Sequence, residues 1–386
     1  MAEALRLAAR IPRRPWPNPP VGALVVRDHQ VVGRGAHHGA GADHAEVIAL
    51  REAGPRALGA TLYCTLEPCN HHGRTPPCAP LVASSGITRL VVGVADPNPA
   101  VCGGGLARVR EAGVEVHSGV MGEDALELIW PFVVTRAFER PFVLLKTATS
   151  LDGFFAPHHQ GAPPGEPTFL TGPAARQDVH RLRRWCDMVV VGERTMMADH
   201  PRLDGRMVPE GDSCPGAEPL PAYVDTDLSL QQAWAKPHWI FAGARCASAT
   251  QQHGIERLEG TVVLCQELDG HVAPASLVAE FQRRGGHCLM VEGGPTLAAA
   301  FLRANVVDRW VSYVAPIVLG AGVTWPGCLA AVDRADVGPT TGEPASRSSY
   351  HLTRSHAVGP DLKSVFDRQS FPETVARLSD THAGSR

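Results

Sequence analysis

The sequence lacks any apolar run approaching the ~20 residues that a membrane-spanning helix requires. Its first residues form a helical pattern, not a signal segment with an apolar core and a small-residue cleavage site. The formal net charge is −3, and no basic face is clustered enough to indicate nucleic-acid binding. No internal repeat is present. These absences exclude a membrane-spanning or repeat protein, disfavour a nucleic-acid-binding protein, and predict a cytoplasmic location.

Ten cysteines would indicate a disulfide framework in a secreted protein, but nothing in the sequence indicates export. We therefore expect reduced thiols. Most of the cysteines stand singly in apolar or loop contexts, where a small buried side chain is the simplest role. Cys69 and Cys78 differ, because of the residues that surround them.

With 386 residues, 44% of them apolar and 19% charged, the chain is long enough for two globular domains. Strand-like and helix-like segments alternate up to Gly119, which predicts an α/β layer with a largely parallel sheet. A second α/β series begins at Phe142, after a long helical segment over 123–138. We predict domains at 1–139 and 140–367 and a disordered tail at 368–386.

The first domain contains the residue types and order of a catalytic zinc site. His44 precedes a predicted helix and lies two residues before Glu46. Cys69 follows a predicted strand, and Cys78 comes nine residues later. One imidazole and two thiolates leave the fourth tetrahedral position of Zn²⁺ for water, whose pKa the metal lowers to about 7. Glu46 can then carry a proton to the ring nitrogen and the leaving ammonia. His-x-Glu with Pro-Cys is the signature of zinc-dependent nucleobase deaminases.

Each part of this pattern is weak alone. His-x-Glu arises by chance in a chain with 18 histidines, and most cysteine pairs are simply buried. All three ligands in this order, each near a predicted helix start, favour the zinc site. A purely structural zinc would need a fourth protein ligand. His71 or His72 lies too close after Cys69 for easy tetrahedral geometry.

Residues 65–78 read Thr-Leu-Glu-Pro-Cys-Asn-His-His-Gly-Arg-Thr-Pro-Pro-Cys. This segment, with residues 17–22 and 96–99, resembles the deaminase half of the bifunctional riboflavin-biosynthesis deaminase/reductase. Most cytidine and tRNA-adenosine deaminases carry only two residues between the paired cysteines, so the eight-residue insert discriminates. The resemblance implies a cytidine-deaminase-like three-layer α/β/α fold, zinc, and substrate contacts from Asn18, His71 and Arg74. An arginine beside the metal can hold a ribose phosphate by bidentate hydrogen bonds.

The second domain contains a strand-to-helix turn at 291–297, Val-Glu-Gly-Gly-Pro-Thr-Leu, where backbone amides can approach an anion. Alone, this turn is weak evidence. Segments 145–153, 170–173 and 192–201 occur in the order found in the reductase half of the same family. The resemblance implies a dihydrofolate-reductase-like α/β fold and NADPH as cofactor. It places NADPH on Ala148, Thr171, Thr195, Asp199, Gly293, Gly294, Pro295 and Thr296. It places the ribose phosphate on Arg183, Leu203, Arg206 and Glu292.

The two halves together imply successive action on 2,5-diamino-6-ribosylamino-4(3H)-pyrimidinone 5′-phosphate, first hydrolytic deamination and then reduction of the ribosyl chain to a ribityl chain. The reductase half departs from the usual family residues at Pro167, Phe169 and His200. A proline at 167 cannot donate a backbone hydrogen bond. Two alternatives therefore stay open for the second domain: a drifted activity in a specialised flavin- or pteridine-like pathway, or a non-catalytic binding or dimerisation module. The long interdomain helix and an edge strand also predict a homodimer.

Overall fold

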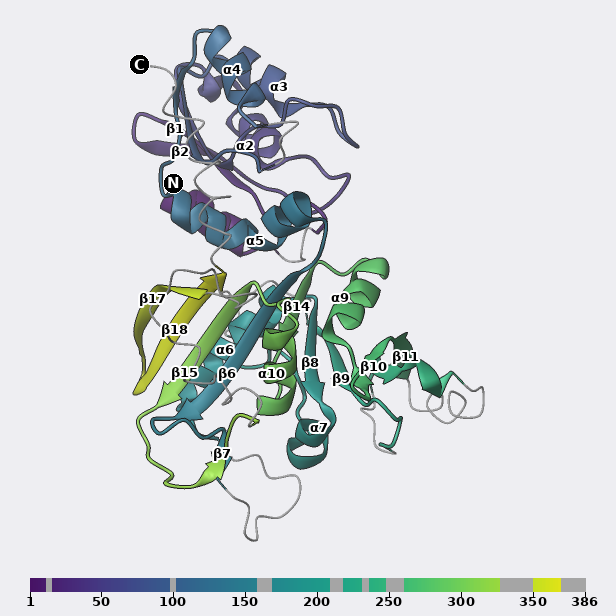
Figure 1. Cartoon of the computed structure of the whole chain (residues 1–386). Helices are drawn as coiled ribbons and strands as arrows, with labels where there is room; N and C mark the ends of the chain where they lie inside the picture. Colours follow the sequence, from purple (N-terminus) through teal and green to yellow (C-terminus); the bar gives the residue numbers. More distant parts are fainter. Residues whose placement is uncertain are drawn as a thin grey trace, which may run out of the picture. The chain divides into compact units, whose positions relative to one another are not determined.

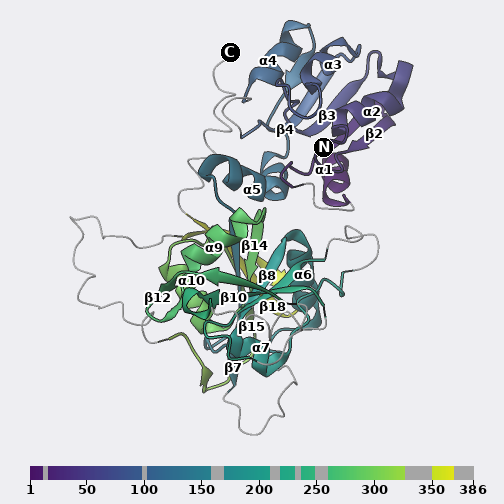
Figure 2. The same cartoon turned by 90° about the vertical axis from the view of Figure 1, so that its right-hand side faces the viewer.

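The computed structural model describes residues 1–11, 16–97, 102–157, 169–208, 218–230, 236–247, 260–326 and 350–368. They fall into two compact units, which are described separately (Figure 1, Figure 2). The N-terminal unit covers the described part of Met1–Arg140. The C-terminal unit covers that of Pro141–Val208 and Glu218–Gln369.

The N-terminal unit is built on a five-stranded sheet with strand order β2-β1-β3-β4-β5. Its strands are β1 (Gly22–Arg27), β2 (Gln30–Ala36), β3 (Thr61–Leu66), β4 (Arg89–Val94) and β5 (Glu115–His117). Its helices are α1 (Ala2–Ala9), α2 (Ala45–Ala53), α3 (Cys78–Ser84), α4 (Gly104–Glu111) and α5 (Gly122–Phe138). The helix and strand starts follow the sequence pattern closely.

The antiparallel β1–β2 hairpin is what the turn over 27–29 predicts, but the prediction of a largely parallel sheet is wrong for the pairing of β1 with β3. β1 runs antiparallel to both β2 and β3, whereas β3, β4 and β5 are parallel. The physical reason is the position of the β1–β2 hairpin. The helix α2 connects β2 to β3, which run in the same direction. Strand β1 lies between these two strands and runs in the opposite direction.

Helices cover both faces of this sheet, as the three-layer α/β/α prediction requires. On one face, a side chain at Gly22 would meet the Ala4 carbonyl oxygen of α1, and one at Gly93 would meet Ala125 of α5. On the other, Gly33 and Gly35 let the backbone of α2 approach directly. Figure 1 shows α5 on the side of the sheet away from α2, α3 and α4. The deaminase-like layering is confirmed.

The C-terminal unit contains a nine-stranded sheet, which can be followed in Figure 1 from β17 at one edge to β11 at the other. The order is β11-β10-β9-β8-β14-β6-β15-β18-β17, parallel from β11 to β15 and antiparallel beyond. Its strands are β6 (Phe142–Ser150), β8 (Met188–Gly192), β9 (Leu220–Val224), β10 (His238–Gly243), β11 (Gly260–Cys265), β14 (Cys288–Val291), β15 (Arg309–Ala315), β17 (Tyr350–Val358) and β18 (Asp361–Arg368). Its helices are α6 (Pro173–Trp185), α7 (Glu193–Asp199), α9 (Pro274–Arg283) and α10 (Pro295–Arg303).

Two helices bury the main core of this unit against one face of the sheet. Leu277 and Phe281 of α9, with Phe301 of α10, pack on strand residues that include Leu145 and Phe241. Side chains from α6 meet polar residues of the other face, described below. This mixed sheet, with helices on both faces, matches the predicted dihydrofolate-reductase-like α/β architecture.

The hairpin β17–β18 was not anticipated from the sequence. A buried ion pair fixes it to the sheet, because Arg309 of β15 donates to both carboxylate oxygens of Asp367 at 2.6 and 2.9 Å. Arg368 belongs to β18, so the predicted disordered tail begins one residue too early. The rest of that tail lies outside the described residues. Within the described ranges, no helix has the length and apolarity needed to cross a bilayer.

We predict that Gly35→Ala destabilises the N-terminal unit by about 1–3 kcal/mol, because overpacking forces backbone apart. An added Cβ would lie 2.0 Å from the Ala45 carbonyl oxygen of α2. Urea unfolding measures the effect. Gly104→Ala is the control, since its nearest neighbour would be the Asn70 amide nitrogen at 3.6 Å. Equal stability of the two variants would contradict this packing argument.

Candidate active sites

The three predicted zinc ligands converge at one edge of the N-terminal sheet. His44 is the residue before α2, Cys69 follows the end of β3, and Cys78 is the first residue of α3. The Nδ1 atom of His44 lies 3.1 Å from the Cys78 sulfur and 3.5 Å from the Cys69 sulfur. The ligand atoms of all three lie within 4.8 Å of one another. Segments far apart in sequence therefore bring one nitrogen and two sulfurs together.

The donor atoms of this cluster suit a divalent metal, although the hydrogen bond to Cys69 raises the pKa of Cys78. The pKa of Cys69 is lowered to about 4, because its sulfur accepts hydrogen bonds from the Cys78 side chain and from the Cys78 backbone N–H at 3.3 Å. The hydrogen bond to Cys69 raises the pKa of His44. Thiolate and imidazole are ligands that Zn²⁺ prefers. Among the described residues, neither His71 nor His72 joins this group, which argues against a closed structural site.

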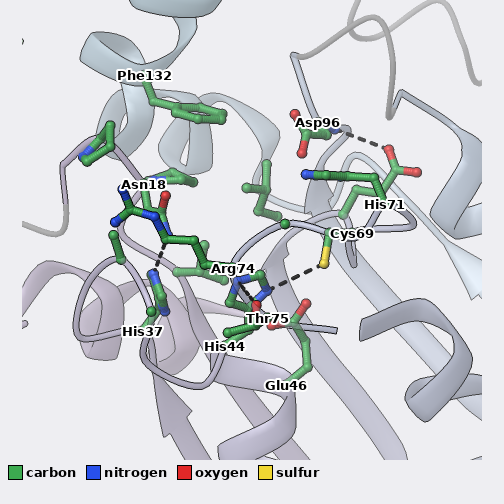
Figure 3. Close-up of a pocket in the computed structure, with 18 of the residues that line it drawn as sticks. Asn18, His37, His44, Glu46, Cys69, His71, Arg74, Thr75, Asp96 and Phe132 are labelled. Carbon is green, nitrogen blue, oxygen red and sulfur yellow. Dashed lines mark hydrogen bonds between the residues drawn. The ribbon is translucent and has the colours of Figure 1, made fainter. Parts of the chain in front are cut away.

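Glu46 lies in the first turn of α2, two residues after His44. It is 3% exposed, and burial raises its pKa to about 7. A carboxyl group with such a pKa both accepts and releases a proton near neutrality. The side chain lines the same cavity as His44 and Cys69, as Figure 3 shows. Its position suits the proton-carrying role predicted for it.

The buried Glu67 holds the cysteine loop in place. Its carboxylate accepts backbone N–H groups from Asp96 and Gly103 on one oxygen, and from Gly105 and Leu106 on the other, at 2.9–3.2 Å. The last two donors belong to the first turn of α4, where a carboxylate is favoured by the helix dipole. Glu67 thus ties the end of β3, and with it Cys69, to the start of α4.

A cavity of about 350 Å³ opens above the cluster. Asn18, His71 and Arg74, which the sequence pattern placed at the substrate, all line it (Figure 3). The structure adds His37, whose Nδ1 donates to the Asp43 carbonyl oxygen at 3.1 Å. Burial lowers the pKa of His37, so its Nε2 accepts from the Asn18 amide at 2.9 Å. The Asn18 carbonyl oxygen is thereby left as an acceptor.

Further lining residues were missed by sequence reasoning. Thr75 is 3.2 Å from His44 Nε2, and Phe132 and Arg136 enter from α5. The sequence signal for Thr75 was its place in the inter-cysteine segment. No signal pointed to α5, which read as a linker. Asp96 also lines the cavity, whereas Asn98 and Pro99 lie outside the described residues.

In the C-terminal unit, most of the predicted cofactor residues lie near the carboxyl end of β6 or in the segments that directly follow β8 and β14. The Gly293-Gly294 pair leads from β14 into α10, and the Gly294 N–H donates to Thr195 Oγ1 of α7 at 3.3 Å. The remaining predicted residues are Ala148 in β6, Thr171 before α6, Asp199 at the end of α7, and Pro295 and Thr296 in the first turn of α10. Carboxyl ends of parallel strands are the usual ligand edge of an α/β sheet.

A partly buried charge cluster lies beside this edge. The Arg183 guanidinium donates to both oxygens of Glu292, at 2.7 and 2.9 Å, and Lys146 Nζ lies 3.3 Å from Glu292. Burial alone would raise the pKa of Glu292, but Arg183 and Lys146 outweigh it and lower the pKa to about 2. Sequence reasoning named Arg183 and Glu292 but missed Lys146, which read as an ordinary strand residue.

The other predicted phosphate residues lie in the segment after α7. Leu203 is buried with a φ of 50°, and Arg206 pairs with the Asp204 carboxylate. Arg206 lines a second cavity of about 520 Å³, together with Arg202 and Lys236.

Two of the three residues that depart from the family pattern lie within the described ranges. Phe169 is 60% exposed, and the central carbon of the Arg176 guanidinium lies 4.7 Å from the centroid of the Phe169 ring. His200 ends α7 with a φ of 41°. Pro167 lies outside the described residues.

Residues 1–94 match the family model of the cytidine and deoxycytidylate deaminase zinc-binding region, and residues 141–331 match that of the RibD C-terminal domain. The riboflavin biosynthesis protein RibD of Escherichia coli is 38% identical over 94% of this chain and 96% of its own length. That of Aquifex aeolicus is 38% identical over 84% and 88%. The chain belongs to the RibD family.

Solved structures agree. Acinetobacter baumannii RibD is 31% identical with a TM-score of 0.71, covering 95% of this chain and 97% of that one. A Thermotoga maritima protein titled diaminohydroxyphosphoribosylaminopyrimidine deaminase/5-amino-6-(5-phosphoribosylamino)uracil reductase is 28% identical, with the same TM-score and coverage. Zinc and NADPH are the cofactors of this family. Because the likeness spans both units, it does not favour a drifted or non-catalytic second domain.

We predict that Cys78→Ser loses most of the bound zinc, because an alcohol replaces one of two thiolates. Metal analysis of the purified protein should give about one zinc ion per chain for the unsubstituted protein and for the control Cys102→Ser. Cys102 is partly exposed and stands outside the cluster. Full zinc content in Cys78→Ser would show that the ion is held elsewhere.

The Glu292 cluster predicts that part of the free energy of unfolding is lost at acid pH. Since its folded pKa of about 2 lies below the ordinary 4.5, its contribution is complete above pH 4.5 and is lost as the pH falls toward 2. Glu292→Gln should cost on the order of 3 kcal/mol near neutral pH by leaving two buried cations unpaired. This cost should shrink as the pH is lowered.

Urea unfolding at several pH values measures this difference. Glu280→Gln is the control, because its pairing with Arg283 is exposed and surface pairs contribute about 0–1 kcal/mol. A cost of Glu292→Gln that is the same near pH 7 and near pH 3 would contradict the linkage argument, which requires about three-fifths of the linked free energy to be lost by pH 3.

Proposed function

We propose that the N-terminal unit hydrolyses the ring amine of 2,5-diamino-6-ribosylamino-4(3H)-pyrimidinone 5′-phosphate and that the C-terminal unit then reduces the ribosyl chain with NADPH. The observation that carries the proposal is the cluster of His44, Cys69 and Cys78, of which His44 and Cys69 line one cavity with the buried Glu46. The membership of both units in the RibD family supports the order of the two reactions.

In the deamination, His44, Cys69 and Cys78 would hold zinc, which would supply a water activated as nucleophile at neutral pH. Glu46 takes up one proton of the attacking water and delivers it to the ring nitrogen. It then takes the second proton from the added hydroxyl group and delivers it to the leaving amine, which departs as ammonia. The Glu46 pKa of about 7 suits both transfers. The cavity shields the carboxyl from bulk water, which keeps that pKa raised.

Substrate recognition follows from the lining residues. Asn18 presents its carbonyl oxygen, fixed by the bond of its amide to His37, and so reads an N–H on the pyrimidinone edge. Arg74 reaches the 5′-phosphate from the inter-cysteine loop. His71, exposed on the same loop, adds a contact to the sugar or base.

In the reduction, NADPH supplies the hydride. The Gly293-Gly294 pair leaves the backbone accessible at the positive end of α10, which suits the pyrophosphate. Ala148, Thr171, Thr195, Asp199, Pro295 and Thr296 complete the proposed cofactor site. Glu292, kept ionised by Arg183 and Lys146, orients sugar hydroxyls, while Leu203 and Arg206 bound the phosphate end.

Finer features belong to the same proposal. We assign 1–139 to deamination and 140–367 to reduction. We propose a homodimer, supported by the exposed edge strand β17. We also propose a reducing, cytoplasmic environment, as the sequence predicts. A small phosphorylated pyrimidine, not a nucleic acid or a membrane, is the proposed partner.

We predict that Glu46→Gln keeps its zinc but loses ammonia release by about 10²–10⁴-fold, because an amide cannot transfer the proton. NADPH oxidation on the separately prepared deaminated intermediate should be unchanged. Ammonia assay, zinc analysis and NADPH absorbance give the three readouts. Normal deamination by this variant would refute the role of Glu46, and no NADPH oxidation by the unsubstituted protein would refute the reductase assignment.

A further inference from the structure

The helix α5 forms part of the wall of the deaminase cavity. Phe132 and Arg136 of α5 line it together with the zinc cluster residues. Phe132 is 7% exposed, and its neighbours Ile129 and Val133 are buried in the unit. Figure 3 shows the Phe132 ring across the drawn site from Glu46. A helix that joins the two units along the chain therefore contributes directly to this pocket.

Arg136 is held at the cavity by Phe132. It lies one helical turn further along α5, so both side chains share a face of the helix. The carbon at the centre of its guanidinium lies 5.4 Å from the centre of the Phe132 ring, within the range of a cation–π contact. This contact restricts the otherwise flexible side chain without using any of its five N–H donors.

The cavity carries two guanidinium groups that no carboxylate neutralises. In the described part of the chain, neither Arg136 nor Arg74 forms an ion pair, whereas Arg51 pairs with Asp43 at 2.8 Å. None of the three acidic side chains of the cavity pairs with them. Glu46 lies buried at the metal cluster, Glu67 is occupied by four backbone N–H groups, and Asp96 is 6% exposed and forms no ion pair with either arginine. The lining therefore offers a site for an anion away from the reacting ring.

We infer that Arg136 is a second phosphate-binding residue of the deaminase and acts with Arg74 as a pair of guanidinium groups on the 5′-phosphate. The inference rests on the proposed function. A guanidinium matches phosphate oxygens through two parallel N–H bonds, and two such groups match the charge of a phosphate dianion. The pair makes the deaminase selective for the phosphorylated pyrimidine over its nucleoside form.

The test compares ammonia release from the phosphorylated pyrimidine and from the same compound after phosphatase treatment, using the zinc-loaded full chain. Arg136→Gln should raise KM for the phosphorylated substrate by about 10- to 100-fold, as expected for loss of a charged hydrogen-bonded contact. Its kcat should stay within about threefold, since the phosphate does not react. KM for the dephosphorylated compound should not change.

Two further variants separate phosphate binding from a packing effect. Arg136→Lys keeps the charge but not the bidentate geometry, so its KM should be intermediate. Arg140→Gln is the matched control, because Arg140 lies over Phe138 at 5.5 Å in the same kind of contact but does not line the cavity. It should behave as the unsubstituted enzyme.

An unchanged KM in Arg136→Gln, or an equal rise for both substrates, would overturn the inference. Absence of ammonia release by the unsubstituted enzyme with the phosphorylated pyrimidine would instead refute the proposed function. In that case direct binding of ribose 5-phosphate replaces the kinetic test. It is measured on chains carrying Arg206→Gln, which removes a proposed phosphate contact of the C-terminal unit, and equal affinity with and without Arg136→Gln overturns the inference.

Discussion

The Glu67 carboxylate accepts four backbone N–H groups, and the geometry of the deaminase site depends on this buried interaction. It joins the end of β3 to the start of α4 and thereby fixes the loop that presents Cys69. His44 and Cys78 are fixed differently, each at the start of a helix packed on the sheet. Three separate segments thus meet to within 4.8 Å without a disulfide or any direct covalent link. The metal site is a consequence of how strands end and helices begin.

The charged side chains of the two candidate sites are paired differently. In the N-terminal cavity, Arg74 and Arg136 stand without carboxylate partners, so an anionic ligand supplies the missing charge. In the C-terminal unit, Glu292 lies between Arg183 and Lys146, so one carboxylate already offsets one of the two positive charges before any ligand arrives. Binding there must rearrange existing ion pairs, whereas binding in the deaminase cavity forms new ones. The same substrate phosphate would therefore be recognised by different physical means in the two reactions.

Local signals in the sequence predicted much of the fold and the deaminase site. The site residues His44, Glu46, Cys69 and Cys78 could be predicted from the sequence, because their chemistry depends on close spacing and on helix starts. The direction of β1 relative to β3 could not be predicted, because strand order depends on which elements pack side by side. The β17–β18 hairpin, held by a pair between Arg309 and Asp367 far apart in sequence, was missed for the same reason. Three further residues were missed because their roles depend on residues distant in sequence: Asn18 for His37, Glu292 for Lys146 and Arg74 for Arg136.

Two successive reactions on one small molecule are the central claim of this account. Mass spectrometry of the product, made with and without NADPH from the phosphorylated diaminopyrimidine, tests it most directly. Without NADPH, the product should have one amine replaced by a carbonyl oxygen and an intact ribosyl group. With NADPH, it should carry two additional hydrogens on the sugar chain. An unchanged amine in both samples, or a product that is the same with and without NADPH, would contradict the account.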